Sequence, residues 1–369
     1  MFINDKRLRS LRHIVRSWLH DEPTPEASGV LEVARWHRLD GLPGINPDTN
    51  AMKIRVAMEL GHQALAIEID RVFRAAGVRY VTTKGVSLAR RCGWPIGTRL
   101  GKDIDILVHH KDRFLAIDSL LDLGFVSSDG IRGLHEAFNI VYALGFRRGN
   151  NMVDLHWRLD SYLYPLKALT EVNFCDSALT IGNSRISIMT PELEFAYVVF
   201  HGAKHLWARW LWLVDLCMFR KAFGHEIAPN KEIETSLGVA HVLTLTLFDF
   251  PLINRSVDSN ESKQAFRILN QYKVNDIKST DPVLFPSWKS FAVNLTFTRS
   301  KFGRIKRIFA ILVEPSVSDV LVLGRILPRK PFIYFIRPFR LSLKYVSYLL
   351  RHCHRLALRL STSKDLKTR

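Results

Sequence analysis

The chain has 369 residues, of which 47% are hydrophobic and 24% are charged, an ordinary composition for a folded protein of two or three domains. Its formal net charge of +18 favours an anionic partner: a nucleotide, a nucleic acid or an anionic membrane surface. The four cysteines are widely spaced and form no Cys-x-x-Cys pair, which argues against a zinc knuckle or a disulfide framework and for reduced thiols.

Residues 1–20 mix basic and apolar side chains and lack the continuous apolar segment of a secretory signal. No apolar stretch reaches the roughly 18 residues of a membrane-spanning helix without a charge or a histidine. We therefore expect a cytoplasmic protein without a transmembrane segment.

The periodicity of apolar residues divides the chain into four parts. Residues 1–75 have helical spacing, with a loop signal at 40–44. Residues 76–160 form a β-α-β-α-β-β unit, because β-branched runs alternate there with amphipathic segments. The expected strands are 77–83, 103–108, 138–146 and 152–159, and the expected helices are 86–92 and 111–123.

Residues 161–350 return to helical spacing, and residues 351–369 form a basic tail. Thr190 and Pro191 mark the start of one helix, and further helices are expected near 230–250 and 261–275. The predicted fold class is therefore α+β: a small mixed sheet with flanking helices, preceded by helices and followed by a mainly helical domain.

Two aspartates interrupt the apolar strand at 103–108. Asp103 and Asp105 are two residues apart and should share one face of the strand. Two buried like charges repel, and a divalent cation such as Mg²⁺, which prefers carboxylate oxygens, would neutralise them. The alternative is that Asp105 caps a turn and Asp103 is solvated at the end of the strand.

The order of these motifs resembles a bacterial family of uncharacterised nucleotidyltransferases in the polymerase-beta-like superfamily. The chain has Lys-Gly before a short helix, Arg four residues ahead of Asp-Ile-Asp-Ile-Leu-Val, then Asp-Leu-His-Trp. A His-x-x-x-His-x-Trp motif and a later aspartate follow in the helical half. The residues that carry the resemblance are Lys84, Gly85, Arg99, Asp103, Asp105, Asp154, His156, His201, His205, Trp207 and Asp215.

The resemblance implies a two-metal reaction. Asp103, Asp105 and Asp154 match three carboxylates that hold two Mg²⁺ ions, which clamp the attacking and leaving oxygens of an in-line displacement. Asp154 would also accept the proton of the incoming hydroxyl group, unless it is an ordinary aspartate at a strand edge. His156, on the same face, would hold the acceptor or Asp154, or is a hydrogen-bonded core histidine.

The resemblance also places nucleotide-binding residues. Gly85 would let backbone amides approach a phosphate. The family usually has a hydroxyl group beside this glycine; here Ser87 would replace that hydroxyl, or Lys84 would contact the phosphate directly. A plain turn is the alternative for Lys84-Gly85. Arg99 would bind phosphate or orient a carboxylate.

The helical half holds further candidates on one predicted helix. Lys204 and His205 would reach the triphosphate or the acceptor, or belong to a structural helix face. The i, i+4 spacing of His201 and His205 also suits zinc, although no third ligand is evident. Three tryptophans that follow, at 207, 210 and 212, favour packing over base stacking.

The basic, amphipathic stretch at 340–359 fits an anionic membrane surface, nucleic acid, or docking on the protein itself. The expected function is Mg²⁺-dependent transfer of a nucleoside monophosphate from an NTP to a hydroxyl acceptor, with ATP as the donor from its frequency in the superfamily. The alternative is a non-catalytic module of the same fold that binds RNA or an anionic membrane, with peripheral membrane association.

Overall fold

The computed structural model describes residues 5–25, 27–45, 48–127, 142–159, 177–224 and 233–272, with short pieces at 302–305, 308–309 and 338–339. The chain divides into two compact units. The first comprises Met1–Gly130, Ala143–Leu159 and Pro165–Arg304, and it contains every helix and strand named below. The expected basic tail and the amphipathic stretch at 340–359 lie outside the described residues.

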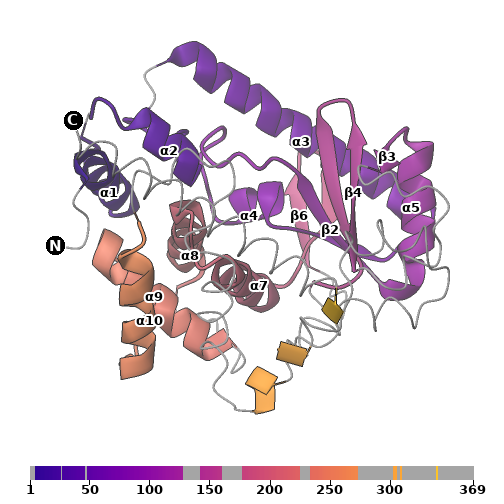
Figure 1. Cartoon of the computed structure of the whole chain (residues 1–369). Coiled ribbons are helices and arrows are strands. Elements are labelled where there is room, and N and C mark those ends of the chain that lie inside the picture. The colour runs from indigo at the N-terminus through magenta and orange to yellow at the C-terminus, as the bar shows by residue number, and fades with distance from the viewer. Residues whose placement is uncertain are drawn as a thin grey trace, which may run out of the picture. The chain divides into compact units, whose positions relative to one another are not determined.

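The first unit contains a five-stranded mixed sheet (Figure 1). Its strands follow the order β1-β2-β5-β4-β3. β2 and β5 are parallel, and the other neighbours are antiparallel. All residues of β1 and β2 are buried, as expected of strands covered on both faces. The strands are β1 Tyr80–Thr83, β2 Ile104–Val108, β3 Val126–Ser127, β4 Ala143–Arg148 and β5 Asn151–His156.

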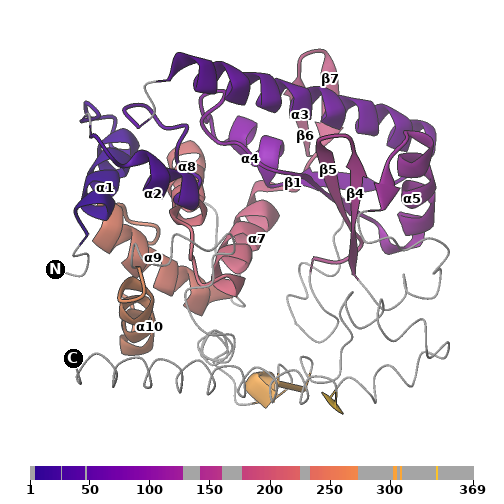
Figure 2. The same ribbon diagram turned by 45° about the horizontal axis from the view of Figure 1, so that its top comes forward.

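Helices from the first half of the chain pack beside this sheet. The long helix α3 (Thr49–Ala75) contacts both α4 (Gly85–Arg91) and α5 (Arg113–Asp122), which follow β1 and β2 along the chain (Figure 2). A single 3₁₀ turn, η1 (His110–Asp112), precedes α5. Arg148 of β4 forms an ion pair with Glu68 of α3 at 2.5 Å, which links the helix to the sheet.

A second group of helices forms the helical half of this unit. The capping residues explain two of its helix starts: Thr190 caps the helix after it, and Asp258 and Glu261 form a capping box. Arg12 Nε donates a 2.7 Å hydrogen bond to the Leu247 carbonyl, which ties the amino-terminal helix to this half. The helices are α1 Lys6–Leu19, α2 Leu31–His37, α7 Pro191–Lys204, α8 Trp210–Phe223, α9 Glu234–Phe248 and α10 Ser259–Leu269.

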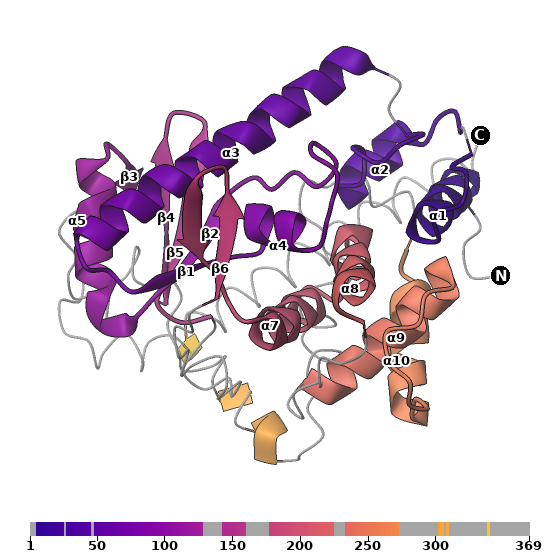
Figure 3. The same ribbon diagram turned by 180° about the vertical axis from the view of Figure 1, so that it is seen from behind.

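The α+β prediction is confirmed, but the short strand β3 and a second, two-stranded sheet were not expected. Residues 178–187 form a hairpin of β6 (Ala178–Ile181) and β7 (Ser184–Ser187) within the part expected to be mainly helical. The hairpin lies beside α3 (Figure 3), and β7 contacts both α3 and β1. Its strands have only four residues each and mix polar with apolar side chains, so they carry little periodic signal.

Among the residues that the structure describes, every helix is too short or too polar to cross a lipid bilayer.

Candidate active site

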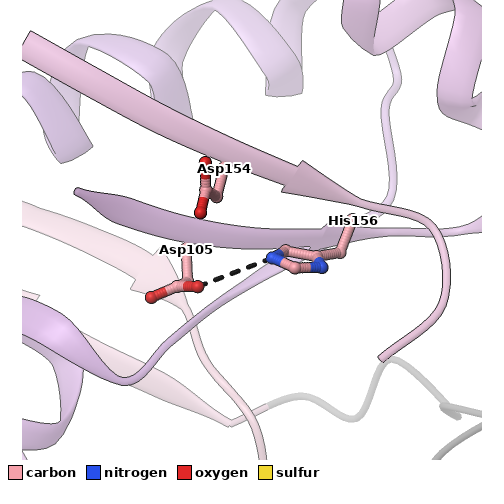
Figure 4. A group of neighbouring side chains, drawn as sticks. All are labelled: Asp105, Asp154 and His156. Carbon is pink, nitrogen blue, oxygen red and sulfur yellow. Dashed lines mark ion pairs between the residues drawn. The ribbon is translucent and has the colours of Figure 1, made fainter. Parts of the chain in front are cut away.

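Asp105 and Asp154 lie opposite each other on the two parallel strands. They are register partners in β2 and β5, so their carboxylates project from the same face of the sheet. Figure 4 shows Asp105, Asp154 and the ring of His156 gathered at one point. His156 Nε2 is 3.5 Å from Asp105 Oδ1. One donor atom from each of the three residues lies within 4.8 Å of the others, close enough for all three to contact one metal ion.

Asp103 lies immediately before β2 and lines the same cavity as Asp105 and Asp154. Its side chain is outside the group of three donor atoms within 4.8 Å. The negative charge of Asp103 nevertheless acts on Asp154. The structure therefore brings all three predicted carboxylates to one cavity, with Asp105 and Asp154 as the closer pair.

Lys84 reaches into this carboxylate group. Its Nζ is 2.7 Å from Asp105 Oδ1, and both side chains are largely buried. The backbone of Lys84 has φ +53° and ψ −144°, an unusual conformation for a residue with a side chain, which costs about 1–3 kcal/mol. The Lys84 N–H group donates to Glu194 Oε1 at 3.2 Å, and Glu194 is paired with Arg91 at 2.7 Å. These contacts hold the strained turn in place.

The carboxylates differ in their pKa values because their surroundings differ. Burial raises the pKa of Asp105, but Lys84 and His156 outweigh it and bring the pKa to about 2. Burial, Asp103 and Asp105 together raise the pKa of Asp154 to about 6. Burial and the charge of Asp105 also raise the pKa of Asp103. At neutral pH the site therefore keeps one firmly ionised carboxylate beside two that bind protons more readily.

A cavity of about 500 Å³ opens over these residues, between the sheet and the helical half of the unit. Two ion pairs, Lys84–Asp105 and Arg99–Asp215, account for four of its charged lining residues. Several other residues of its wall were not expected from the sequence. They are Arg38, Leu88, Leu100, Gly101, Lys102, Val198, Arg209 and Leu211.

Arg99 makes a buried ion pair that joins the two halves of the unit, as Arg91 does with Glu194. Its Nε and Nη2 donate to the two carboxylate oxygens of Asp215 on α8 at 2.6 and 2.9 Å. Its Nη1 donates to the Gly85 carbonyl at 2.9 Å. Of the two roles expected for Arg99, the structure therefore shows the pairing with a carboxylate, and that carboxylate belongs to the helical half. Gly85, with φ +37°, is held at the cavity wall by this contact.

Of the other three predicted nucleotide-binding residues, one lines the cavity and two do not. Ser87 is fully buried in α4, where its hydroxyl donates to the Lys84 carbonyl at 2.8 Å, and it does not line the cavity. Lys204 is exposed at the end of α7 and is also absent from the lining. His205 does line the cavity.

The aromatic residues after α7 separate into core and cavity wall. Trp207 and Trp210 are completely buried, as the packing interpretation predicts. The ring of Trp212 lines the cavity and stacks on His205 with centroids 5.1 Å apart, while His201 meets it edge-on at 5.6 Å. Burial lowers the pKa of His201 and of His205, and nearby lysines add to the effect. This wall therefore presents neutral aromatic rings at pH 7.

The donor set fits a divalent cation. Three carboxylates offer the oxygen ligands that Mg²⁺ prefers. Both ring nitrogens of His156 are buried; Nε2 has only the long 3.5 Å contact with Asp105, and Nδ1 has no hydrogen-bond partner among the described residues, which leaves the ring able to meet a bound group. In the protein as described, the Lys84 ammonium supplies the positive charge beside Asp105.

Comparisons with known proteins identify the family to which this chain belongs. One solved structure similar to this chain is the solution structure of the antibiotic-resistance factor ANT(2'')-Ia, at 14% identity and a TM-score of 0.35, covering 48% of this chain and 90% of that one. No curated protein sequence matches. Residues 49–235, just over half of the chain, match the model of a family described as uncharacterised nucleotidyltransferases. This protein is a member of that nucleotidyltransferase family.

Proposed function

We propose that the protein transfers a nucleoside monophosphate from an NTP, with ATP as the donor, to a hydroxyl acceptor. The observation that carries this proposal is the convergence of Asp105 and Asp154 from two parallel strands, with Asp103 on the same cavity wall. These three carboxylates would hold two Mg²⁺ ions, and the bound ions would supply positive charge for activating the acceptor hydroxyl and for neutralising the departing pyrophosphate.

The protein groups have separate tasks in this scheme. The acceptor oxygen bonds to the α-phosphorus, the bond from the α-phosphorus to the bridging oxygen breaks, and pyrophosphate leaves with the electron pair. Asp154 accepts the proton of the acceptor hydroxyl at a carboxylate oxygen. Lys84 leaves Asp105 and moves to a phosphate oxygen. Gly85, at the turn into α4, leaves room for the nucleotide beside the strand.

A label-transfer experiment tests this function. The protein is incubated with Mg²⁺, each NTP labelled at the α-phosphate, and fractionated cell extract. We expect label to appear in a nucleotidylated product, with release of unlabelled pyrophosphate, when ATP is the donor. Asp105→Asn and Asp154→Asn should lower this transfer by at least about 10³-fold, because each removes a metal ligand. Full transfer by either variant would refute the proposal.

A second candidate is a non-catalytic module that binds RNA or an anionic membrane. The Lys84–Asp105 ion pair favours this candidate, because an ammonium group beside Asp105 can replace a metal ion. It predicts RNA or vesicle binding that weakens steeply with salt, together with no NTP consumption. Label transfer that depends on Asp105 would exclude it.

A further inference from the structure

We propose that Arg38 binds the β- and γ-phosphates of the nucleotide, the part that leaves as pyrophosphate. This inference rests on the proposed function and adds a residue that lies outside the family match at 49–235. Arg38 lines the active-site cavity together with Lys84, Asp103 and Asp105. It comes from the amino-terminal helical region, which would therefore complete the nucleotide site.

The backbone at Arg38 is strained and firmly held. Arg38 ends α2 with φ +58° and ψ +35°, a left-handed conformation that costs a residue with a side chain about 1 kcal/mol. Its neighbour His37 accepts a 3.1 Å hydrogen bond from the Trp210 N–H group at Nδ1 and stacks on the Trp210 ring at 4.5 Å. α2 is thereby fixed to α8, and the Arg38 side chain is directed into the cavity. Strain kept in place by such contacts is typical of functional positions.

The Arg38 guanidinium lacks an acceptor of its own. In the part of the chain that the structure describes, it makes no side-chain hydrogen bond and no ion pair within 4.0 Å, and its Nε is buried. A buried N–H donor without a hydrogen-bond partner is costly, and an anion bound in the cavity would satisfy it. Burial also lowers the pKa of Arg38, while the charge of Asp103 opposes this effect.

The position of Arg38 relative to the carboxylates indicates which phosphates it meets. Arg38 lines the cavity together with Asp103 and with Lys84, which moves to a phosphate oxygen in the proposed scheme. Asp154, the proposed proton acceptor, marks the side of the attacking hydroxyl. In an in-line displacement the leaving group departs on the side opposite to the attack. In this assignment Arg38 and Lys84 serve the pyrophosphate side, where a planar guanidinium can bind two phosphate oxygens at once.

Binding measurements with three probes test this assignment. Calorimetry with Mg²⁺ and ATP, tripolyphosphate or AMP is performed on the full-length wild type, Arg38→Gln and Arg38→Lys. We expect Arg38→Gln to weaken ATP and tripolyphosphate binding about ten- to hundred-fold and to leave AMP binding unchanged. Arg38→Lys should recover part of the loss, because it keeps the charge but not the two-pronged geometry.

Arg35→Gln is the matched control, because Arg35 is an exposed arginine on the same helix. It should bind all three probes like the wild type. Unchanged ATP binding by Arg38→Gln, or an equal loss for AMP, would overturn the role of Arg38 while leaving the proposed function intact. A wild-type protein that binds no NTP at all would overturn both.

Discussion

The Lys84 ammonium lies 2.7 Å from the Asp105 carboxylate, on the face of the sheet that Asp105 shares with Asp154. A metal ion bound to Asp105 needs the same carboxylate, so lysine and metal compete for it. The pair also explains how a buried carboxylate remains ionised with a pKa of about 2. Lys84 therefore stabilises the metal-free site and must be displaced, toward the nucleotide phosphates in our scheme, when the site is loaded.

Replacing Lys84 by methionine should separate these two effects. Without its partner Asp105 is a buried, uncompensated charge, so the metal-free protein should lose about 3–5 kcal/mol of unfolding free energy. The affinity for Mn²⁺ should rise about ten-fold, because the ion no longer competes with an ammonium group. Urea denaturation and Mn²⁺ titration measure the two quantities. Lys53→Met, at an exposed position of α3, should change neither. Weaker Mn²⁺ binding by Lys84→Met would show that Lys84 does not compete with the metal.

The Arg99–Asp215 pair should behave as a buried ion pair that holds the two halves of the unit together. Both side chains are at most 7% exposed. Asp215→Ala leaves Arg99 without a counter-charge and should cost about 3–5 kcal/mol in unfolding free energy. The double variant Arg99→Met/Asp215→Leu should cost clearly less than the sum of the two single changes.

Glu22→Ala provides the exposed comparison for this pair. Glu22 pairs with Arg16, and both side chains are at least one-third exposed. This change should cost less than about 1 kcal/mol. If Asp215→Ala costs no more than Glu22→Ala, the Arg99–Asp215 pair does not hold the unit together.

The sequence predicted the elements around the site well, because their signals are local. The β-branched run before Lys84, the apolar strand around Asp105 and the cap at Thr190 each lie within a few residues, and each element is present. The convergence of Asp103, Asp105 and Asp154 followed from the family resemblance together with strand alternation.

The partners of these residues could not be predicted in the same way. Arg99 and Asp215 are 116 residues apart, and any of several carboxylates could have paired with Arg99. Ser87 was a candidate for phosphate binding because it lies two residues after Gly85. The first turn of α4 instead places its hydroxyl against the Lys84 carbonyl. Arg38 belongs to no motif, and it reaches the cavity at the end of α2, which packs on α8 through His37 and Trp210.

Gly41 should be needed for the loop that carries Arg38. A Cβ atom at this position would lie 2.6 Å from both Arg55 Nη2 and the Thr98 carbonyl oxygen. Gly41→Ala must therefore push the loop away from the segment that leads to Arg99, and we expect a loss of about 1–3 kcal/mol in unfolding free energy and weaker ATP binding. Thermal denaturation and calorimetry check both effects.

Gly61→Ala is the control for this change. Gly61 lies in α3, and a Cβ atom there would meet nothing within 4 Å. Alanine at this site should stabilise the protein by about 0.5–1 kcal/mol, because it favours the helix. A Gly41→Ala variant as stable as the wild type would contradict the close packing of the loop.

His37 should make stability depend on pH. Burial lowers its pKa well below 6.5, and nearby Arg209 adds to the effect. In the unfolded chain His37 therefore binds a proton near pH 6.5, whereas in the folded protein it stays neutral at that pH. The unfolding free energy therefore contains the full contribution of His37 above pH 6.5. Below that pH it falls by up to about 1.4 kcal/mol per pH unit.

His37→Asn tests this dependence, because the asparagine amide oxygen can still accept the hydrogen bond from the backbone N–H of Trp210 but does not titrate. Urea denaturation between pH 7.5 and 5.5 should show a steeper loss of unfolding free energy for the wild type than for the variant. Parallel pH profiles for the two proteins would show that His37 is not held neutral in the folded state.

The binding of Mn²⁺ in the presence of a non-hydrolysable ATP analogue, followed by electron paramagnetic resonance, tests the central claim most directly. We predict that the wild type binds two Mn²⁺ ions together with the analogue, that Asp105→Asn and Asp154→Asn each lose at least about ten-fold in affinity, and that the exposed-surface variant Asp118→Asn is unchanged. Equal Mn²⁺ binding by the wild type and by both active-site variants would contradict the assignment of these carboxylates as the metal ligands of a nucleotidyltransferase.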